Sequence, residues 1–138
     1  MKEKIDLVKL WLKKADNDLL TAENSLKIRP EPPLDTICFH AQQCAEKYLK
    51  VFLIFQEIDF EKTHNLTDLV ALAMKRDPEF RQIMEFGKTL TPYAVEIRYP
   101  GIFDEFLTID KAREAVELAR RIKKFVLPKL SIETDSHD

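Results

Sequence analysis

Phe39-His40-Ala41-Gln42-Gln43-Cys44-Ala45-Glu46-Lys47-Tyr48-Leu49-Lys50 is the most informative stretch of this sequence. Its apolar residues, with those that follow to residue 55, cover almost half of a helix circumference at about 100° per residue. Further apolar side chains (Phe39, Leu53 and Ile54) fall on the opposite side. A helix that is apolar nearly all round is buried nearly all round. We therefore expect a helix over 36–56 that is the centre of a bundle or part of a subunit interface.

Polar side chains interrupt this apolar helix and are expected to form one row, namely His40, Gln43, Glu46 and Lys47. Polar groups in a buried helix are either satisfied by partners or available to bind a ligand. A second polar and aromatic stretch follows about fifty residues later, from Tyr93 to Pro100, and contains Arg98. We predict that any functional site lies where these two stretches meet.

Four other segments also have helical spacing of their apolar residues. The first runs from about residue 5 to 28 and is ended by Pro30, Pro32 and Pro33, which cannot continue a helix. The second helix is expected to begin at Asp35 or Thr36 and the third at Asn65. The fourth is expected to begin at Asp77, before Pro78, and the fifth at Thr108 with Asp110. Gly87 and Pro92 are expected to interrupt the fourth helix, and Pro128 to end the fifth.

Five helices and no convincing strand predict an all-α fold, an antiparallel up-and-down bundle. We expect one domain over residues 1–130, followed by a polar, flexible tail over 131–138. The segment from Tyr99 to Thr108 carries four bulky apolar groups, which favours a lid or a contact with a partner.

The composition narrows the function classes. The chain has 138 residues, is 45% hydrophobic, contains only two glycines and has a net charge of −2. So few glycines argue against a Gly-rich phosphate loop, and the net charge gives no cationic field for non-specific binding of nucleic acid. Charged residues at positions 2, 3, 4 and 6 interrupt any signal peptide, and no apolar run is long enough for a bilayer. We expect a cytoplasmic protein.

The two cysteines predict neither a disulfide nor a metal site. Cys38 and Cys44 are six positions apart on one predicted helix, about 9 Å along its axis. This separation is too large for a disulfide and does not fit CxxC metal spacing. We expect both to be small buried hydrophobic residues, and no histidine or carboxylate has metal-ligand spacing. No cofactor is expected.

The chain resembles the HEPN family (higher eukaryote and prokaryote nucleotide-binding domains), in its small stand-alone prokaryotic branch. The resemblance covers most of the chain. It is carried by four motifs: Trp11-x-x-x-Ala15-x-x-Asp18-Leu19-x-x-Ala22, the stretch from Phe39 to Lys50, Lys62-Thr63-His64-Asn65-Leu66, and Arg98-Tyr99-Pro100. It implies an up-and-down helical bundle that is a homodimer. It also implies a minimal nucleotidyltransferase as a separate partner, in a toxin–antitoxin-like module.

One part of the family pattern is absent. Ribonuclease members carry Arg, four to six residues and then His, whereas Phe103, Asp104 and Glu105 occupy the corresponding positions after Arg98. Metal-independent RNA cleavage needs a base and an acid, a role that suits imidazole. We therefore expect a protein that binds a nucleotide, RNA or another phosphate-bearing partner and does not act as an enzyme by itself. The alternative is a ribonuclease with a substitute base, for which His40 is the candidate.

The predicted ligand cleft has no catalytic residue and is lined by six side chains: Arg98, His40, Gln43, Glu46, Lys47 and Tyr93. Each of these residues could instead have a purely structural role. Arg98 could pair with Glu96 or with the helix dipole, and Glu46 and Lys47 could form interhelical ion pairs. Asp18 is expected to pair with another helix, and His64 to fix the start of the third helix. The apolar surplus on residues 36–56 predicts a dimer, and a charged substitution of Phe39 or Leu53 should weaken association if those side chains face the mate.

Overall fold

A computed structural model describes residues 2–95, 101 and 105–130. Within these residues all regular secondary structure is helical, which confirms the all-α prediction. The elements are α1 (Lys2–Ser25), α2 (Leu34–Phe55), α3 (Leu66–Met74), the 3-10 segment η1 (Pro78–Ile83), α4 (Met84–Leu90), the 3-10 segment η2 (Thr91–Ala94), α5 (Ile109–Val126) and the 3-10 segment η5 (Leu127–Lys129). The predicted tail, Arg98 and half of the 99–108 segment lie outside the described residues.

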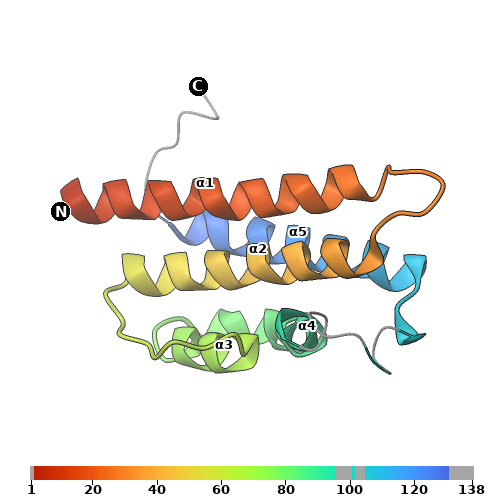
Figure 1. The fold of residues 1–138 in the computed structure, drawn as a ribbon. Helices are drawn as coiled ribbons and strands as arrows, with labels where there is room; N and C mark the ends of the chain where they lie inside the picture. The colour runs from red at the N-terminus through yellow and green to blue at the C-terminus, as the bar shows by residue number, and fades with distance from the viewer. Residues whose placement is uncertain (1, 96–100, 102–104, 131–138) are drawn as a thin grey trace.

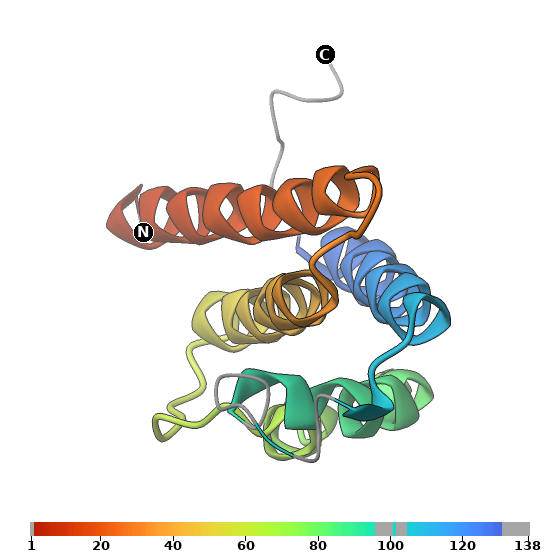
Figure 2. The same ribbon diagram turned by 45° about the vertical axis from the view of Figure 1, so that its right-hand side comes forward.

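The helices form three layers (Figure 1). The long helix α1 is the first layer, α2 and α5 lie side by side in the second, and α3 and α4 form the third (Figure 2). The chain reverses direction between α1 and α2, so the N-terminal end of α1 lies on the same side of the molecule as the C-terminal end of α2. The antiparallel arrangement of the long helices is therefore as predicted, whereas α3 and α4 are short and pack as a separate layer.

Helix α2 is central because other helices cover it on several sides, and its contacts with α1, α5 and α3 hold the bundle together. Its inward side chains include Tyr48 and Phe52, which are fully or almost fully buried. The ring of Phe52 lies 4.3 Å from that of Phe80, and Phe80 lies 4.9 Å from Phe125 of α5. Burial of such aromatic side chains removes large apolar areas from water and stabilises the junction of these layers.

The helix start signals predicted from the sequence have mixed outcomes. Asn65 accepts a hydrogen bond from the backbone N–H of Thr67, and Thr108 accepts one from that of Lys111, so both cap as expected. Asp77 also caps, but the segment that it begins is the 3-10 turn η1. The prediction for α2 was wrong, because its N-cap is Pro33 and Asp35 lies in the first turn.

Gly87 does not interrupt a helix, contrary to the prediction, and lies inside α4. A Cβ atom at this position would come within 3.2 Å of the Cβ of Leu66 at the start of α3. The glycine therefore permits a close approach of α3 and α4. Thr91 supports the same junction, since its hydroxyl donates to the carbonyl of Gly87 and accepts from the N–H of Leu66.

The apolar surplus of α2 is covered within one chain to a greater extent than the sequence suggested. Leu53 is fully buried within one chain and therefore does not face a dimer mate, whereas Phe39 is partly buried against the same core. Cys38 and Cys44 are buried and free, as expected. Among the described helices, none combines the length and the hydropathy that a membrane span requires.

Candidate functional site

A carboxylate of α1 joins two of the predicted site residues of α2. Asp18 Oδ1 lies 2.9 Å from His40 Nδ1, and Asp18 Oδ2 accepts a hydrogen bond of 2.5 Å from Lys47 Nζ. Lys47 also donates to Gln43 Oε1 at 3.4 Å. We call this group the Asp18 cluster (Asp18, His40, Gln43 and Lys47). It confirms that Asp18 pairs with another helix, and it brings three of the predicted site residues together.

The remaining polar residue of the predicted row, Glu46, belongs to a second group. Its Oε2 accepts from Lys50 Nζ at 2.9 Å, and its Oε1 lies 2.9 Å from His64 Nδ1 and accepts from Gln42 Nε2 at 3.1 Å. Gln42 also donates to the backbone carbonyl of His64. We call this group the Glu46 cluster (Gln42, Glu46, Lys50 and His64). It fixes the chain just before α3, which is the structural role expected for His64.

The Glu46 carboxylate stays ionised in spite of its burial. Burial by itself raises the pKa of Glu46, but the hydrogen bonds from Lys50, His64 and Gln42 together lower the pKa below its ordinary value. Lys50 and Glu46 are both almost fully buried, so each neutralises a charge that would be costly alone. This pair is structural, because neither charge is free to meet a ligand without leaving the other unpaired.

The two clusters are joined by one hydrogen bond, since Gln43 donates to Gln42 Oε1 at 2.7 Å. A continuous path of side-chain hydrogen bonds therefore runs from Asp18 on α1 to His64 before α3. The predicted single row is divided because Glu46 lies about 100° around the helix from Lys47. His40 and Lys47 keep 29% and 18% of their side-chain area exposed. In the Glu46 cluster His64 is 41% exposed, but Glu46 and Lys50 are only 6% and 10% exposed. The Asp18 cluster is thus the part in which a histidine and a lysine could both meet a ligand.

Both histidines share one arrangement, in which Nδ1 faces a carboxylate and Nε2 makes no hydrogen bond to another described residue. An ionised carboxylate only accepts hydrogen bonds, so Nδ1 carries the hydrogen in each case. The Nε2 atom of a neutral ring then presents a lone pair. A carboxylate that orients an imidazole in this way supports general-base chemistry.

The other predicted site residues are not placed in this group. Tyr93 is buried, and burial, with the nearby Cys38 thiol and Glu114 carboxylate, raises the pKa of its phenol to about 12. Cys38 and His40 point to opposite sides of α2, because two residues correspond to about 200° of rotation. Tyr93 therefore belongs to the packing side of α2. Arg98 lies outside the described residues.

Sequence reasoning missed Gln42 and Lys50 as members of the polar network. Their spacing with Glu46 (positions 42, 46 and 50) is the i, i+4 pattern of side chains that meet on one helix face. That pattern could have identified the cluster, whereas its link to His64 depends on the path of the 56–65 loop. Among the described residues, no three His, Cys, Asp or Glu side chains are grouped as a metal site requires.

Comparison with known proteins agrees with this architecture. The HEPN domain model matches residues 8–130. The crystal structure of ST0689, an archaeal HEPN homologue, has 28% sequence identity and a TM-score of 0.73, covering 90% of this chain and 98% of its own. The crystal structure of TT1696 from Thermus thermophilus has 30% identity and a TM-score of 0.75, covering 89% and 98%.

A search of curated proteins finds no significant match. The family model nevertheless spans most of the sequence, and the described helices have the fold of the archaeal HEPN homologue. The chain therefore belongs to the HEPN family.

Proposed function

We propose that the protein is a nucleotide- or phosphate-binding HEPN homodimer that acts with a separate minimal nucleotidyltransferase in a toxin–antitoxin-like module. The observation that carries the binding proposal is the part-exposed Asp18 cluster, in which Lys47 and His40 are held in place by one carboxylate. Preorganised polar side chains on a rigid helix suit the recognition of a charged ligand. Arg98, which follows η2 in the sequence, supplies the bidentate donor that favours phosphate.

Calorimetric titration with ATP, with GTP and with a mixed pool of short RNAs tests this proposal. Arg98→Ala should weaken binding by about 2–5 kcal/mol if the arginine meets a desolvated phosphate. The free energy of unfolding should change by only about 0.3–1 kcal/mol, as expected for a helix-end charge. Arg98→Lys should recover part of the affinity, because lysine restores the charge without the planar fork.

The matched control is Arg113→Ala, which removes an exposed arginine from the first turns of α5, where its ion-pair partner is Asp110. This variant should bind like the wild type. If Arg98→Ala lowers the melting temperature and leaves binding unchanged, Arg98 has a structural role and the proposed site is wrong. Absence of binding to all three ligands would also refute the proposal.

A second candidate function, metal-independent ribonuclease activity, is favoured by one specific observation. His40 has the Nδ1–carboxylate contact that orients an imidazole base, and 29% of its side chain is exposed. His40 Nε2 would take the proton of a ribose 2′-hydroxyl, whose oxygen attacks the adjacent phosphorus. The 5′-oxygen then leaves and receives a proton, giving a cyclic phosphate and a free 5′-hydroxyl.

Cleavage of an RNA pool in the presence of EDTA distinguishes this candidate from binding alone. If His40 is the base, His40→Ala should lower the cleavage rate about 10²–10⁴-fold. His64→Ala is the matched control, because His64 has the same kind of carboxylate contact in the other cluster. No cleavage by the wild type, or equal loss in both variants, would exclude His40 as a specific base.

We place the contact with the nucleotidyltransferase partner at the segment before α5. Phe106 is 57% exposed there, and large apolar groups at a surface often meet another protein. We expect Phe106→Ser to weaken co-purification with a minimal nucleotidyltransferase from the same genome. Leu20→Ser, which changes a similarly exposed residue of α1, is the control. Equal retention of the partner by both variants would place its contact elsewhere.

A further inference from the structure

His64 is the accessible member of the Glu46 cluster, and the proposed function makes no use of it. Its side chain is 41% exposed, whereas its carboxylate partner is almost fully buried. The residue is fixed at two points, because its Nδ1 lies 2.9 Å from Glu46 Oε1 and its backbone carbonyl accepts from Gln42 Nε2 at 3.1 Å. A ring that is held on one side by buried groups presents its other side to the solvent.

The exposed side of this ring carries a nucleophilic nitrogen. Because the ionised carboxylate of Glu46 only accepts hydrogen bonds, Nδ1 of His64 carries the ring hydrogen. The other nitrogen, Nε2, makes no hydrogen bond to another described residue and keeps its lone pair. This tautomer can attack an electrophile through Nε2 without first losing a proton.

The Glu46 carboxylate is placed to stabilise the positive charge that such an attack creates. Burial raises the pKa of Glu46, but hydrogen bonds from Lys50, His64 and Gln42 lower it below its ordinary value, so the group is ionised at neutral pH. Lys50 pairs with Oε2, whereas Oε1 is directed at the ring of His64. A fixed charge beside a developing opposite charge stabilises a transition state, because no reorganisation is needed as the reaction proceeds.

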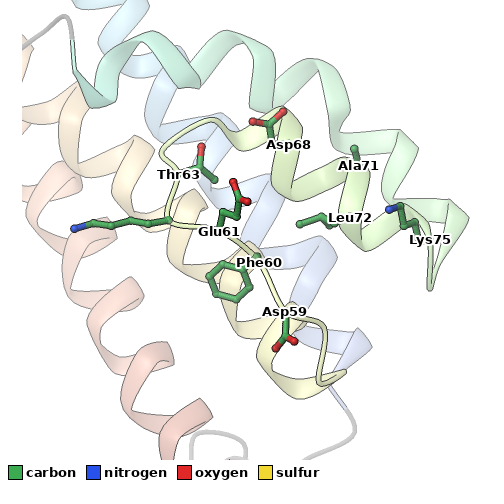
Figure 3. Close-up of a pocket in the computed structure, with 9 residues that line it drawn as sticks. Asp59, Phe60, Glu61, Thr63, Asp68, Ala71, Leu72 and Lys75 are labelled. Atoms are coloured by element: carbon green, nitrogen blue, oxygen red, sulfur yellow. The ribbon is translucent and has the colours of Figure 1, made fainter.

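The surroundings of His64 indicate the size of the electrophile. The loop that leads to it lines a hollow of about 660 Å³, which Figure 3 shows between the loop and α3. Thr63 belongs to this lining and His64 does not, nor does His64 line the neighbouring hollow that contains Ile54 and Ile58. A nitrogen outside both hollows suits a compact reactant. Lys62, two positions earlier, is exposed and has no ion pair with any described residue, so a cation close in the chain is free to meet an anion.

We infer that His64 Nε2 accepts a phosphoryl group from a compact donor of the phosphoramidate class. The lone pair of Nε2 attacks phosphorus, and the new N–P bond forms as the P–N bond of the N-protonated donor breaks. The electron pair of the broken bond leaves with the donor nitrogen, which departs as ammonia. The ring keeps its Nδ1 hydrogen, so the product is a phosphorylated imidazolium beside the Glu46 carboxylate. This acceptor site involves no residue of the Asp18 cluster and goes beyond the proposed function.

Incubation of the full chain with potassium phosphoramidate tests the inference. Tandem mass spectrometry measures the rate at which each histidine gains the phosphoryl mass. His64 should be labelled at least about tenfold faster in the folded protein than in a synthetic peptide of residues 60–68, which lacks the Glu46 carboxylate. The label should be lost in acid and retained in base, as expected for an N–P bond.

Four variants show which charges contribute to the labelling rate. Glu46→Gln keeps an oxygen acceptor but removes the charge, and it should slow labelling of His64 at least about tenfold. Glu61→Gln makes the same change at an exposed glutamate three positions before His64, and it should not slow the reaction. Lys62→Ala should slow labelling to a smaller extent. Lys75→Ala, which removes another exposed lysine from the lining of the hollow, should leave the rate unchanged.

Two outcomes overturn the inference. One is labelling of His64 in the wild type that is no faster than in the peptide. The other is a Glu46→Gln protein that is folded by circular dichroism and labelled as fast as the wild type. If this variant does not fold, nitrogen-15 NMR of the wild-type imidazoles at alkaline pH replaces it. His64 should then show a protonated Nδ1 and an unprotonated Nε2, and the opposite tautomer would also overturn the inference.

Discussion

Glu46 links a buried charge to the pH dependence of stability. Its pKa is lowered in the folded protein from an ordinary value of 4.5. A carboxyl group with a lowered folded pKa stabilises the protein fully above its unfolded pKa, and this contribution is lost as the pH falls through the folded pKa. We therefore expect Glu46→Gln to be less stable than the wild type at pH 7, and the difference to shrink below about pH 4.5.

Denaturant unfolding at pH 7 and at about pH 3.5 measures this difference. The control is Glu61→Gln, which makes the same change at an exposed glutamate with no ion pair within the described residues. Its effect on stability should be small at both pH values. A Glu46→Gln deficit that is equal at both pH values would show that the ionised state of Glu46 contributes nothing to stability.

Glu57 occupies a backbone position that suits glycine. Its φ of 58° is in the left-handed region, directly after the last turn of α2. A residue with a Cβ atom is disfavoured there by about 1–2 kcal/mol. Its side chain is 76% exposed, so its ion pair with Lys4 adds little. We expect Glu57→Gly to raise the free energy of unfolding by about 0.5–1 kcal/mol. Glu57→Ala keeps the Cβ and should give no gain, and equal stability of the two variants would contradict this account.

The candidate site shows how far single residues can be predicted from the sequence. The polar side chains of residues 40–47 were identifiable because charge is unusual in a helix so apolar, and Asp18 was expected to pair with another helix. The division into two clusters was not foreseen. It depends on which neighbour meets each side of α2, and His64 reaches Glu46 only because the 56–65 loop turns back along that helix. Such long-range contacts leave no local pattern.

For the helices, the sequence predicted the capping residues better than the contacts between one helix and another. Asn65 and Thr108 cap α3 and α5 as expected, because capping depends on side chains and N–H groups within three residues. Gly87 was read as a helix interruption because glycine is unfavourable inside a helix. Its actual role depends on Leu66, which is distant in the sequence and adjacent in space.

The junction of α3 and α4 provides a prediction at this scale. A Cβ atom at position 87 would lie within 3.2 Å of Leu66 Cβ. Gly87→Val should therefore lower the free energy of unfolding by about 1–3 kcal/mol, because its methyl groups would overpack the junction. Gly101→Val is the control, since no atom of the described residues lies within 4 Å of the position of a Cβ there. Thermal unfolding of both variants provides the comparison. A Gly87→Val protein as stable as the control would mean that the two helices separate without cost.

For the whole molecule, the sequence predicted the bundle but overestimated how much apolar surface α2 leaves uncovered. Periodicity showed that α2 is apolar almost all round, but it could not show whether other helices of the same chain or a second copy covers it. In the structure the shorter helices and α5 cover much of it, and Leu53 is fully buried. Exposed leucines lie on α1, namely Leu7, Leu10 and Leu20.

This difference gives opposite predictions for two leucines. Leu53 is fully buried, so Leu53→Ala should lower the free energy of unfolding by about 2–5 kcal/mol through a cavity in the core of one chain, while the folded protein keeps its oligomeric mass. Leu10 is 54% exposed, so Leu10→Ala should change the free energy of unfolding little. Light scattering and denaturant unfolding on both variants measure the two quantities. If Leu53→Ala instead yields a stable monomer, Leu53 contacts a second copy after all, and the surface of α2 that the sequence first suggested is the dimer interface.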